Sequence, residues 1–139
     1  MNIILLASGQ GSRLRPETED YPKPLVKVNS NKRIFDYFLD ATKRIKSEVE
    51  IIIATGYKYK NFDQLNLTTI YNPFYETTNM LFGIWFTINK LKSLEKDLIV
   101  SYGDIIFPPN TFEKLREKDE ITIVTDSNWE SNYIGRTSH

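Results

Sequence analysis

The feature that most constrains the fold is a glycine-rich segment that follows directly on a short apolar run. Residues 3–5 are Ile-Ile-Leu, and residues 6–16 continue as Leu-Ala-Ser-Gly-Gln-Gly-Ser-Arg-Leu-Arg-Pro. This order predicts a first β-strand over residues 2–7 that opens into a loop. Gly9 and Gly11 lack a Cβ, so the backbone can come close to a ligand and turn its N–H groups toward it. The segment therefore indicates a strand end that holds a ligand.

Two basic residues near the glycines indicate that this ligand carries phosphate. Arg13 offers a planar fork of donors for phosphate oxygens, and Lys23 offers a mobile point charge. Two common phosphate-binding motifs are excluded by their spacing. No Lys-Ser or Lys-Thr pair follows the second glycine as in a P-loop, and Leu14 stands where a dinucleotide fingerprint has its third glycine. The segment is therefore another kind of phosphate loop, or an ordinary turn between a strand and a helix.

A longer pattern favours the phosphate loop. Residues 9–25 fill the string G-x-G-S-R-L-x-P-x-T-x-x-x-P-K-P-L without a gap. This string resembles the signature of nucleotidyltransferases that make nucleoside-diphosphate sugars and related cytidylylated small molecules. The resemblance implies that Arg13 and Lys23 are catalytic. The expected nucleotide-binding residues are Leu6, Ala7, Ser8, Gly9, Gly11, Ser12, Arg13, Lys23, Asn79 and Asp104.

The composition narrows the class of protein. A chain of 139 residues with 40% apolar residues can form one domain with a buried core, so we expect a single domain over residues 1–139. Basic and acidic residues number 18 each, which argues against nucleic-acid or membrane partners. No cysteine is present, which excludes disulfides and thiolate metal sites. We expect a cytoplasmic location, and homo-oligomerisation stays open.

Apolar periodicity predicts alternating strands and helices along the chain. The expected strands cover residues 2–7, 49–55, 67–71, 97–101 and 120–125, and the expected helices cover 33–46, 58–65, 78–91 and 111–117. Residues 8–32 are expected to be mostly loop, and Thr77 or Thr78 is the expected N-cap of the helix over 78–91. The alternation predicts an α/β fold, with a Rossmann-like, mainly parallel sheet flanked by helices.

Three features are expected to meet on one rim of this sheet. The glycine loop follows the first predicted strand, Tyr71-Asn72-Pro73 follows the third, and Gly103-Asp104 follows the fourth. Ligands of open parallel sheets bind outside the carboxyl ends of the strands. The predicted topology alone therefore places a binding site there.

Asp104 is the candidate metal ligand. Mg²⁺ prefers one or two carboxylates together with water and phosphate oxygens, and Asp104 would supply a carboxylate beside a phosphate loop. A turn aspartate after a glycine is the alternative. The family resemblance favours Mg²⁺ as the cofactor, because members carry a metal-binding aspartate in a Gly-Asp motif that follows an apolar strand.

Residues 71–83 are similar to one branch of this family, the cytidylyltransferases that act on phosphocholine, aminoethylphosphonate and similar small phosphorylated amines. The branch carries an aromatic-rich Tyr-Asn-Pro loop and an Asn before a helix. An amide can donate and accept, which suits the hydrogen-bonding edge of cytosine. Asn79 is therefore the candidate base-reading residue, and a helix-capping role is the alternative.

The final residues resemble a W-x-x-x-Y-x-G-R-T-x-H segment of the same branch. The resemblance implies that Trp129 and Tyr133 form an aromatic wall for an ammonium group, while Arg136 contacts the acceptor phosphate. The alternative is a terminus with an aromatic staple. Members of the branch continue beyond this point, so we expect the chain to lack the family's C-terminal portion.

Together these features imply transfer of CMP from Mg–CTP to a small phosphorylated acceptor, with release of pyrophosphate. Phosphocholine, aminoethylphosphonate and glutamine phosphate are the expected kinds of acceptor. A sugar-1-phosphate uridylyltransferase or thymidylyltransferase is one alternative. A nucleotide-binding module without turnover is the other.

Overall fold

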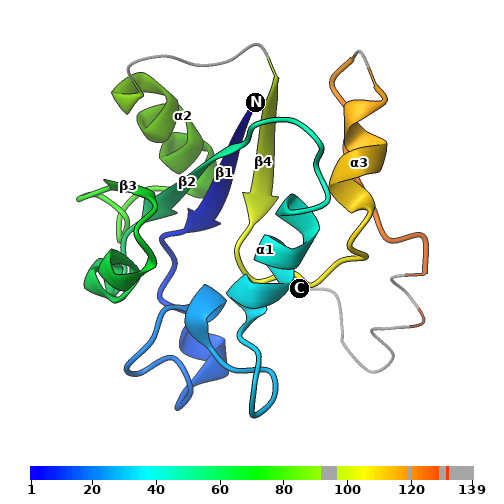
Figure 1. Ribbon diagram of the computed structural model, residues 1–139. Helices are drawn as coiled ribbons and strands as arrows, with labels where there is room; N and C mark the ends of the chain where they lie inside the picture. Colours follow the sequence, from blue (N-terminus) through cyan, green and yellow to red (C-terminus); the bar gives the residue numbers. More distant parts are fainter. Residues whose placement is uncertain (92–96, 119, 129–130, 132–139) are drawn as a thin grey trace.

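A computed structural model describes residues 1–91, 97–118, 120–128 and 131 of the chain. In this part of the chain four strands form one sheet, in the order β3-β2-β1-β4 (Figure 1). Their bounds are Asn2–Ala7 for β1, Glu50–Thr55 for β2, Thr68–Tyr71 for β3 and Leu98–Tyr102 for β4. All three neighbouring pairs are parallel. The predicted α/β fold with a parallel sheet is thus confirmed.

Helices cover both faces of the sheet, because the strands carry apolar residues on both faces (Figure 1). The α-helices are α1 over Ile34–Thr42, α2 over Met80–Lys90 and α3 over Thr111–Arg116. Ile3 and Leu5 of β1 pack with α1 and α3, whereas Ile4 faces the other side and packs with α2. No helix among the described residues is long and apolar enough to cross a membrane.

The glycine-rich segment folds into a compact loop with two short 3₁₀ helices, η1 over Ser12–Leu14 and η2 over Lys23–Leu25. The fully buried Thr18 donates its hydroxyl to the Gly11 carbonyl at 2.8 Å. Tyr57 follows β2 in the chain, and its hydroxyl donates to the Thr18 carbonyl at 3.0 Å. A third 3₁₀ helix, η3 over Tyr59–Leu65, comes next in the chain. The loop is therefore held against the end of the neighbouring strand.

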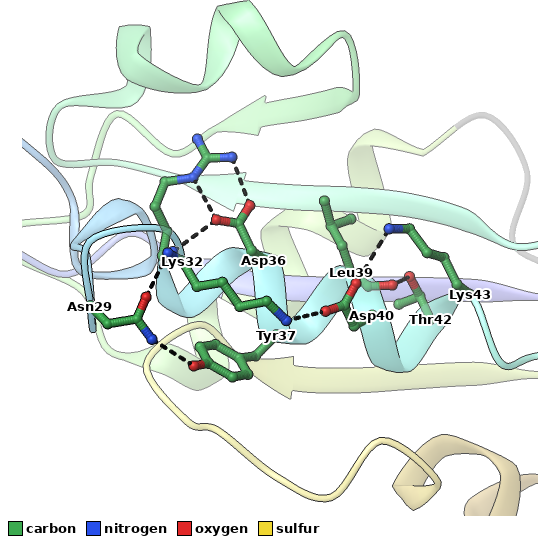
Figure 2. A network of polar contacts seen from close by, with 9 residues as sticks. Asn29, Lys32, Asp36, Tyr37, Leu39, Asp40, Thr42 and Lys43 are labelled. Atoms are coloured by element: carbon green, nitrogen blue, oxygen red, sulfur yellow. Dashed lines mark hydrogen bonds and ion pairs between the residues drawn. The ribbon is translucent and has the colours of Figure 1, made fainter.

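A polar network fixes the start of α1, close to the segment that carries η2 (Figure 2). The Arg33 backbone N–H donates to Asp36 Oδ2 at 2.8 Å, and the Arg33 guanidinium pairs with Asp36 Oδ1 at 2.8 Å. The Arg33 hydrogen bond lowers the pKa of Asp36 below its usual value. Lys32 Nζ donates to Asp40 at 2.7 Å. The Ile34 N–H donates to the Val26 carbonyl at 3.1 Å, which ties α1 to the residue after η2.

The prediction of a fifth strand over residues 120–125 is wrong. This segment has no strand structure, and Ile121 and Ile123 are 99% and 81% exposed. The reason lies in the position of α3, which packs on the same face as α1. The chain moves across the sheet in one direction when it passes from β1 through α1 to β2. To reach a position outside β4 through α3, it would move across the sheet in the opposite direction. A parallel strand outside β4 would therefore need a left-handed crossover, which proteins avoid.

Candidate active site

The loops after β1, β3 and β4 meet at one rim of the sheet, where they surround a cavity of about 220 Å³. Register places the strand ends side by side: Ala7 pairs with Thr55, Leu6 with Tyr102, and Thr55 with Tyr71. The cavity is lined by Leu6, Ala7, Ser8, Gly9, Lys23, Pro24, Asn72, Tyr75, Thr78, Asn79, Met80, Gly83, Tyr102, Gly103 and Asp104. The three features that were expected on one rim thus line one cavity.

Lys23 and Asp104, which both line this cavity, form an ion pair. Lys23 Nζ donates to Asp104 Oδ2 at 2.8 Å, although 81 residues separate the two in sequence. Their side chains are 28% and 37% exposed, so both stay accessible to a ligand from solvent. The structure therefore brings together the predicted catalytic lysine and the predicted metal ligand.

Gly103 allows this meeting. A Cβ at Gly103 would lie 2.5 Å from the Leu6 carbonyl oxygen and 2.7 Å from Pro24 Cγ. The Gly103 N–H also donates to the Leu6 carbonyl at 3.0 Å. Without a side chain at this position, the end of β4 can lie against the end of β1 and against η2. Asp104 consequently lies next to Lys23.

Gly11 also helps to place Lys23 next to Asp104. Its φ of +67° is in the left-handed region that favours glycine. A Cβ there would also lie 2.7 Å from Lys23 Cγ and 2.9 Å from Thr18 Cγ2. Gly11 does not line the cavity, so its role in the structure is to make room for the stem of Lys23. Gly9, in contrast, lines the cavity, and a Cβ there would meet nothing within 4 Å.

Of the remaining predicted residues of the glycine loop, Ser12 and Arg13 do not line the cavity, whereas Ser8 does. Ser12 and Arg13 belong to η1, are exposed, and do not line it. Among the described residues, no ion pair or side-chain hydrogen bond of Arg13 is found. The guanidinium can therefore turn toward a ligand without breaking a contact within the described part of the protein. Ser8 lines the cavity, but its hydroxyl donates to the Ala54 carbonyl at 3.1 Å and its own carbonyl accepts the Tyr57 N–H at 3.0 Å.

Asn79 caps α2 and also lines the cavity. Its Oδ1 accepts the Phe82 N–H at 3.0 Å, so it is the N-cap of α2, and the expected cap at Thr77 or Thr78 is wrong. Thr78 instead donates its hydroxyl to the Phe74 carbonyl at 2.7 Å. Asn79 also lines the cavity, and its Nδ2 has no partner within the described residues. The cap therefore leaves one amide donor for a ligand.

Asn72 organises the turn that precedes α2, a role that spacing alone did not reveal. The side chain is 3% exposed, and its Oδ1 accepts the Phe74 N–H at 2.9 Å. Its Nδ2 donates to the Thr78 hydroxyl at 3.2 Å.

Tyr75 packs over Gly56, where a Cβ would lie 2.6 Å from the Tyr75 ring. Loss of solvent raises the pKa of the Tyr75 phenol, which stays protonated and able to donate near neutral pH.

The predicted acceptor-binding residues and the predicted metal ligand differ in what the structure describes of them. The candidate acceptor-binding residues Trp129, Tyr133 and Arg136 lie outside the described residues. Asp104 stands alone as a candidate metal ligand, because the described part of the chain holds no cluster of three or more His, Cys, Asp or Glu side chains that could bind a metal. A metal at Asp104 would therefore need further ligands from a bound molecule or water.

The comparison with known families decides what kind of site this is. Residues 3–133 match the MobA-like NTP transferase domain. The chain belongs to this family. The glycine loop, Lys23 and Asp104 therefore lie at the strand ends of an NTP transferase domain.

Cytidylyltransferases are among the known proteins of similar sequence. The chain is 39% identical over 140 residues to CTP:phosphoglutamine cytidylyltransferase of Campylobacter jejuni, which covers 93% of this chain and 54% of that enzyme. It is 36% identical over 95 residues to choline-phosphate cytidylyltransferase of Streptococcus pneumoniae, which covers 66% of this chain and 41% of that enzyme. The chain thus spans about half the length of these two curated relatives.

Solved structures agree with this relationship. The CTP:phosphocholine cytidylyltransferase from Streptococcus pneumoniae superposes with a TM-score of 0.64 at 32% identity, over 74% of this chain and 44% of that one. The inositol-1-phosphate CTP transferase from T. maritima superposes with a TM-score of 0.62 at 25% identity, over 86% of this chain and 49% of that one. This NTP transferase domain therefore shares its fold with cytidylyltransferases.

Proposed function

We propose that this NTP transferase domain transfers CMP from Mg–CTP to a small phosphorylated acceptor and releases pyrophosphate. The observation that carries the proposal is the Lys23–Asp104 pair beside Gly9 in one cavity at the strand ends. Three of the similar proteins support CTP as the nucleotide, because their names specify CTP or cytidylyl transfer. Two of them also support a phosphorylated amine or amino acid as the acceptor, such as phosphocholine or glutamine phosphate. Aminoethylphosphonate is a further candidate that rests on the sequence resemblance alone.

The reaction needs positioning and charge neutralisation more than covalent chemistry. The acceptor phosphate attacks the α-phosphorus of CTP in line, a new P–O bond forms, and the bond to pyrophosphate breaks. No general base is required, because the acceptor phosphate is already ionised at neutral pH. Lys23 would leave Asp104 and hold the α-phosphate and the acceptor phosphate together. Arg13, with its guanidinium free to turn, would hold the departing β- and γ-phosphates.

Asp104 would hold the nucleotide's Mg²⁺. Its carboxylate is exposed at the cavity, and such a single carboxylate suits a magnesium ion that keeps water and phosphate oxygens as its other ligands. When bound, the ion neutralises charge that develops on the phosphates. The protein's own part is to hold one carboxylate at the strand end and to offer Lys23 as a second, movable charge.

The uncharged side of the cavity would receive cytidine. The Asn79 Nδ2 would donate to the O2 or N3 acceptor of cytosine, with help from backbone groups of residues 6–9. Trp129, Tyr133 and Arg136 are proposed to meet the acceptor. This assignment rests on the resemblance of residues 126–139 to the cytidylyltransferase branch.

Two measurements test the proposal. Calorimetric titration with CTP, UTP, ATP and GTP in the presence of Mg²⁺ should show a preference for CTP. Pyrophosphate release should then be screened with phosphocholine, aminoethylphosphonate, glutamine phosphate and glucose 1-phosphate. Preference for UTP together with turnover of the sugar phosphate would replace the proposal with a uridylyltransferase. Binding of CTP without pyrophosphate release from any acceptor would reduce the domain to a nucleotide-binding module.

A further inference from the structure

Gly83 lies in the interior of α2, where glycine destabilises a helix relative to alanine. Backbone conformation does not require it, because within the described residues a positive φ occurs at Lys58, Asn66 and Gly11. The helix is not interrupted there either. The Gly83 N–H donates to the Asn79 carbonyl at 3.1 Å, and the Gly83 carbonyl accepts the Thr87 hydroxyl at 2.8 Å. The glycine therefore needs another explanation.

Close packing does not explain Gly83. Apart from its chain neighbours and the adjoining backbone of α2, a Cβ at Gly83 would meet nothing within 4 Å, whereas at Gly56 and Gly103 it would meet atoms at 2.6 and 2.5 Å. Gly83 is nevertheless buried, and it lines the cavity at the strand ends. The space in front of its Cα thus belongs to the cavity. A side chain would fit the unliganded protein, and glycine leaves that space free.

The chemistry of the cavity walls indicates what enters this space. Lys23 and Asp104 form a charged wall that suits phosphate and its counterion. Gly83 belongs to a second wall, which α2 and the turn before it supply and which includes the uncharged Asn79 and Met80. A ligand with a charged end and a flat, polar-edged end matches the two walls. The volume of about 220 Å³ is below the roughly 300–1,000 Å³ of ordinary ligand pockets, which favours a small ring.

We propose that Gly83 keeps open the subsite for the base of a pyrimidine nucleotide. This inference rests on the proposed function and deepens it, because it names the residue that makes room for the ring. Gly83 acts through the absence of a side chain. Added atoms would occupy the space that the ring needs and would spare the phosphate contacts of Lys23.

The test is Gly83→Ala in the full chain, with melting temperature and calorimetric binding of cytidine, CMP and Mg–CTP as readouts. Without ligand, the melting temperature should rise by about 3–5 °C, because alanine favours the helix and its methyl group meets nothing. Affinity for all three ligands should fall by the same factor, about tenfold or more, because they share the ring. Asn89→Ala is the matched control. Asn89 is exposed on the same helix and does not line the cavity, so its variant should bind as the parent does.

The other outcomes separate this inference from the proposed function. If the parent binds CTP and Gly83→Ala binds it equally well, the Gly83 subsite is wrong and the proposed function stands. A loss that affects CTP and spares cytidine would move the subsite to the phosphates and would also overturn it. A fall in melting temperature would mean that the protein itself fills the space. If the parent binds none of the three ligands, both proposals fail.

Discussion

At the scale of single residues, the chemistry of the domain depends on Lys23. Because the Lys23–Asp104 pair is partly exposed, it contributes little to stability, and removing it should not unfold the protein. Lys23→Ala should lower kcat for pyrophosphate release by about 10²–10³-fold, the usual cost of one lost preorganised contact to the transition state. The affinity for CTP should change little. Steady-state kinetics and calorimetry check both, with Lys27→Ala as the control, and an unchanged kcat would exclude the catalytic role.

Asn79 offers a second prediction at this scale, because its two amide atoms have different tasks. Asn79→Asp keeps an oxygen that caps α2 but lacks the Nδ2 donor, whereas Asn79→Ala lacks both. Asn79→Ala should lose about 1 kcal/mol of unfolding free energy, and Asn79→Asp should lose much less. Both variants should bind CTP more weakly. Urea unfolding and CTP titration separate the roles, and parental CTP affinity in Asn79→Asp would leave Asn79 as a cap alone.

Much of the site was predictable at the residue scale. Lys23 and Asp104 could be placed together because one follows the glycine loop, the other follows a strand, and parallel strands end on one rim. Gly83 could not be predicted, because spacing does not show which face of α2 borders a cavity. The roles of Gly56 and Gly103 could not be predicted from the sequence for a similar reason. The atoms that crowd them, such as the Tyr75 ring and the Leu6 carbonyl, come from distant parts of the sequence.

At the scale of elements, the four strands of the sheet were predicted within one residue at each end. The end of α1, the start of α2 and the fifth strand were not predicted correctly. Long runs such as Ile51-Ile52-Ile53 identify a strand buried on both faces. Helix ends depend on caps, and α2 begins after Asn79 because that side chain reaches the Phe82 N–H. A strand also needs a neighbour. The segment at 120–125 has strand-like composition without one.

Exposure of the 120–125 segment leads to a stability prediction. Ile121→Ser should change the free energy of unfolding by less than about 0.5 kcal/mol, because Ile121 is 99% exposed. Ile53→Ala in β2, where the side chain is fully buried, should cost about 2–5 kcal/mol and serves as the comparison. Urea unfolding of the two variants gives the values. A loss near that of Ile53→Ala would mean that Ile121 is buried in a fifth strand after all.

The start of α1 should depend on pH through Asp36. The Arg33 hydrogen bond lowers the pKa of Asp36 from its ordinary value of 3.8, so the ionised carboxylate stabilises the folded state. That contribution is complete above pH 3.8 and is lost as pH falls below it through the folded-state pKa. Asp36→Asn should cost about 0.5–1 kcal/mol at pH 7. The difference from the parent should shrink at more acid pH, and urea unfolding at pH 7, 5 and 3 measures it. A difference that stays constant would show that the charge is not responsible.

At the scale of the whole molecule, the cavity joins segments that are far apart in sequence. Its lining comes from β1 and its loop, from η2, from the segment around the start of α2, and from the end of β4. A ligand in the cavity therefore contacts all of these parts at once and cannot bind the unfolded chain in the same way. Binding should consequently stabilise the entire fold, by an amount set by ligand concentration and affinity.

This linkage gives the last prediction. Mg–CTP at 100 times its dissociation constant should add about 2.7 kcal/mol to the free energy of unfolding. The melting temperature should rise by several degrees. Asp104→Asn should remove most of the rise that depends on Mg²⁺, and EDTA should do the same to the parent, because both take away the carboxylate–metal contact. Thermal melts of parent and variant, with CTP or ATP and with Mg²⁺ or EDTA, form the complete set. If the variant and the parent respond equally to Mg²⁺, then Asp104 is a turn residue whose partner is Lys23, and the metal contact must come from elsewhere.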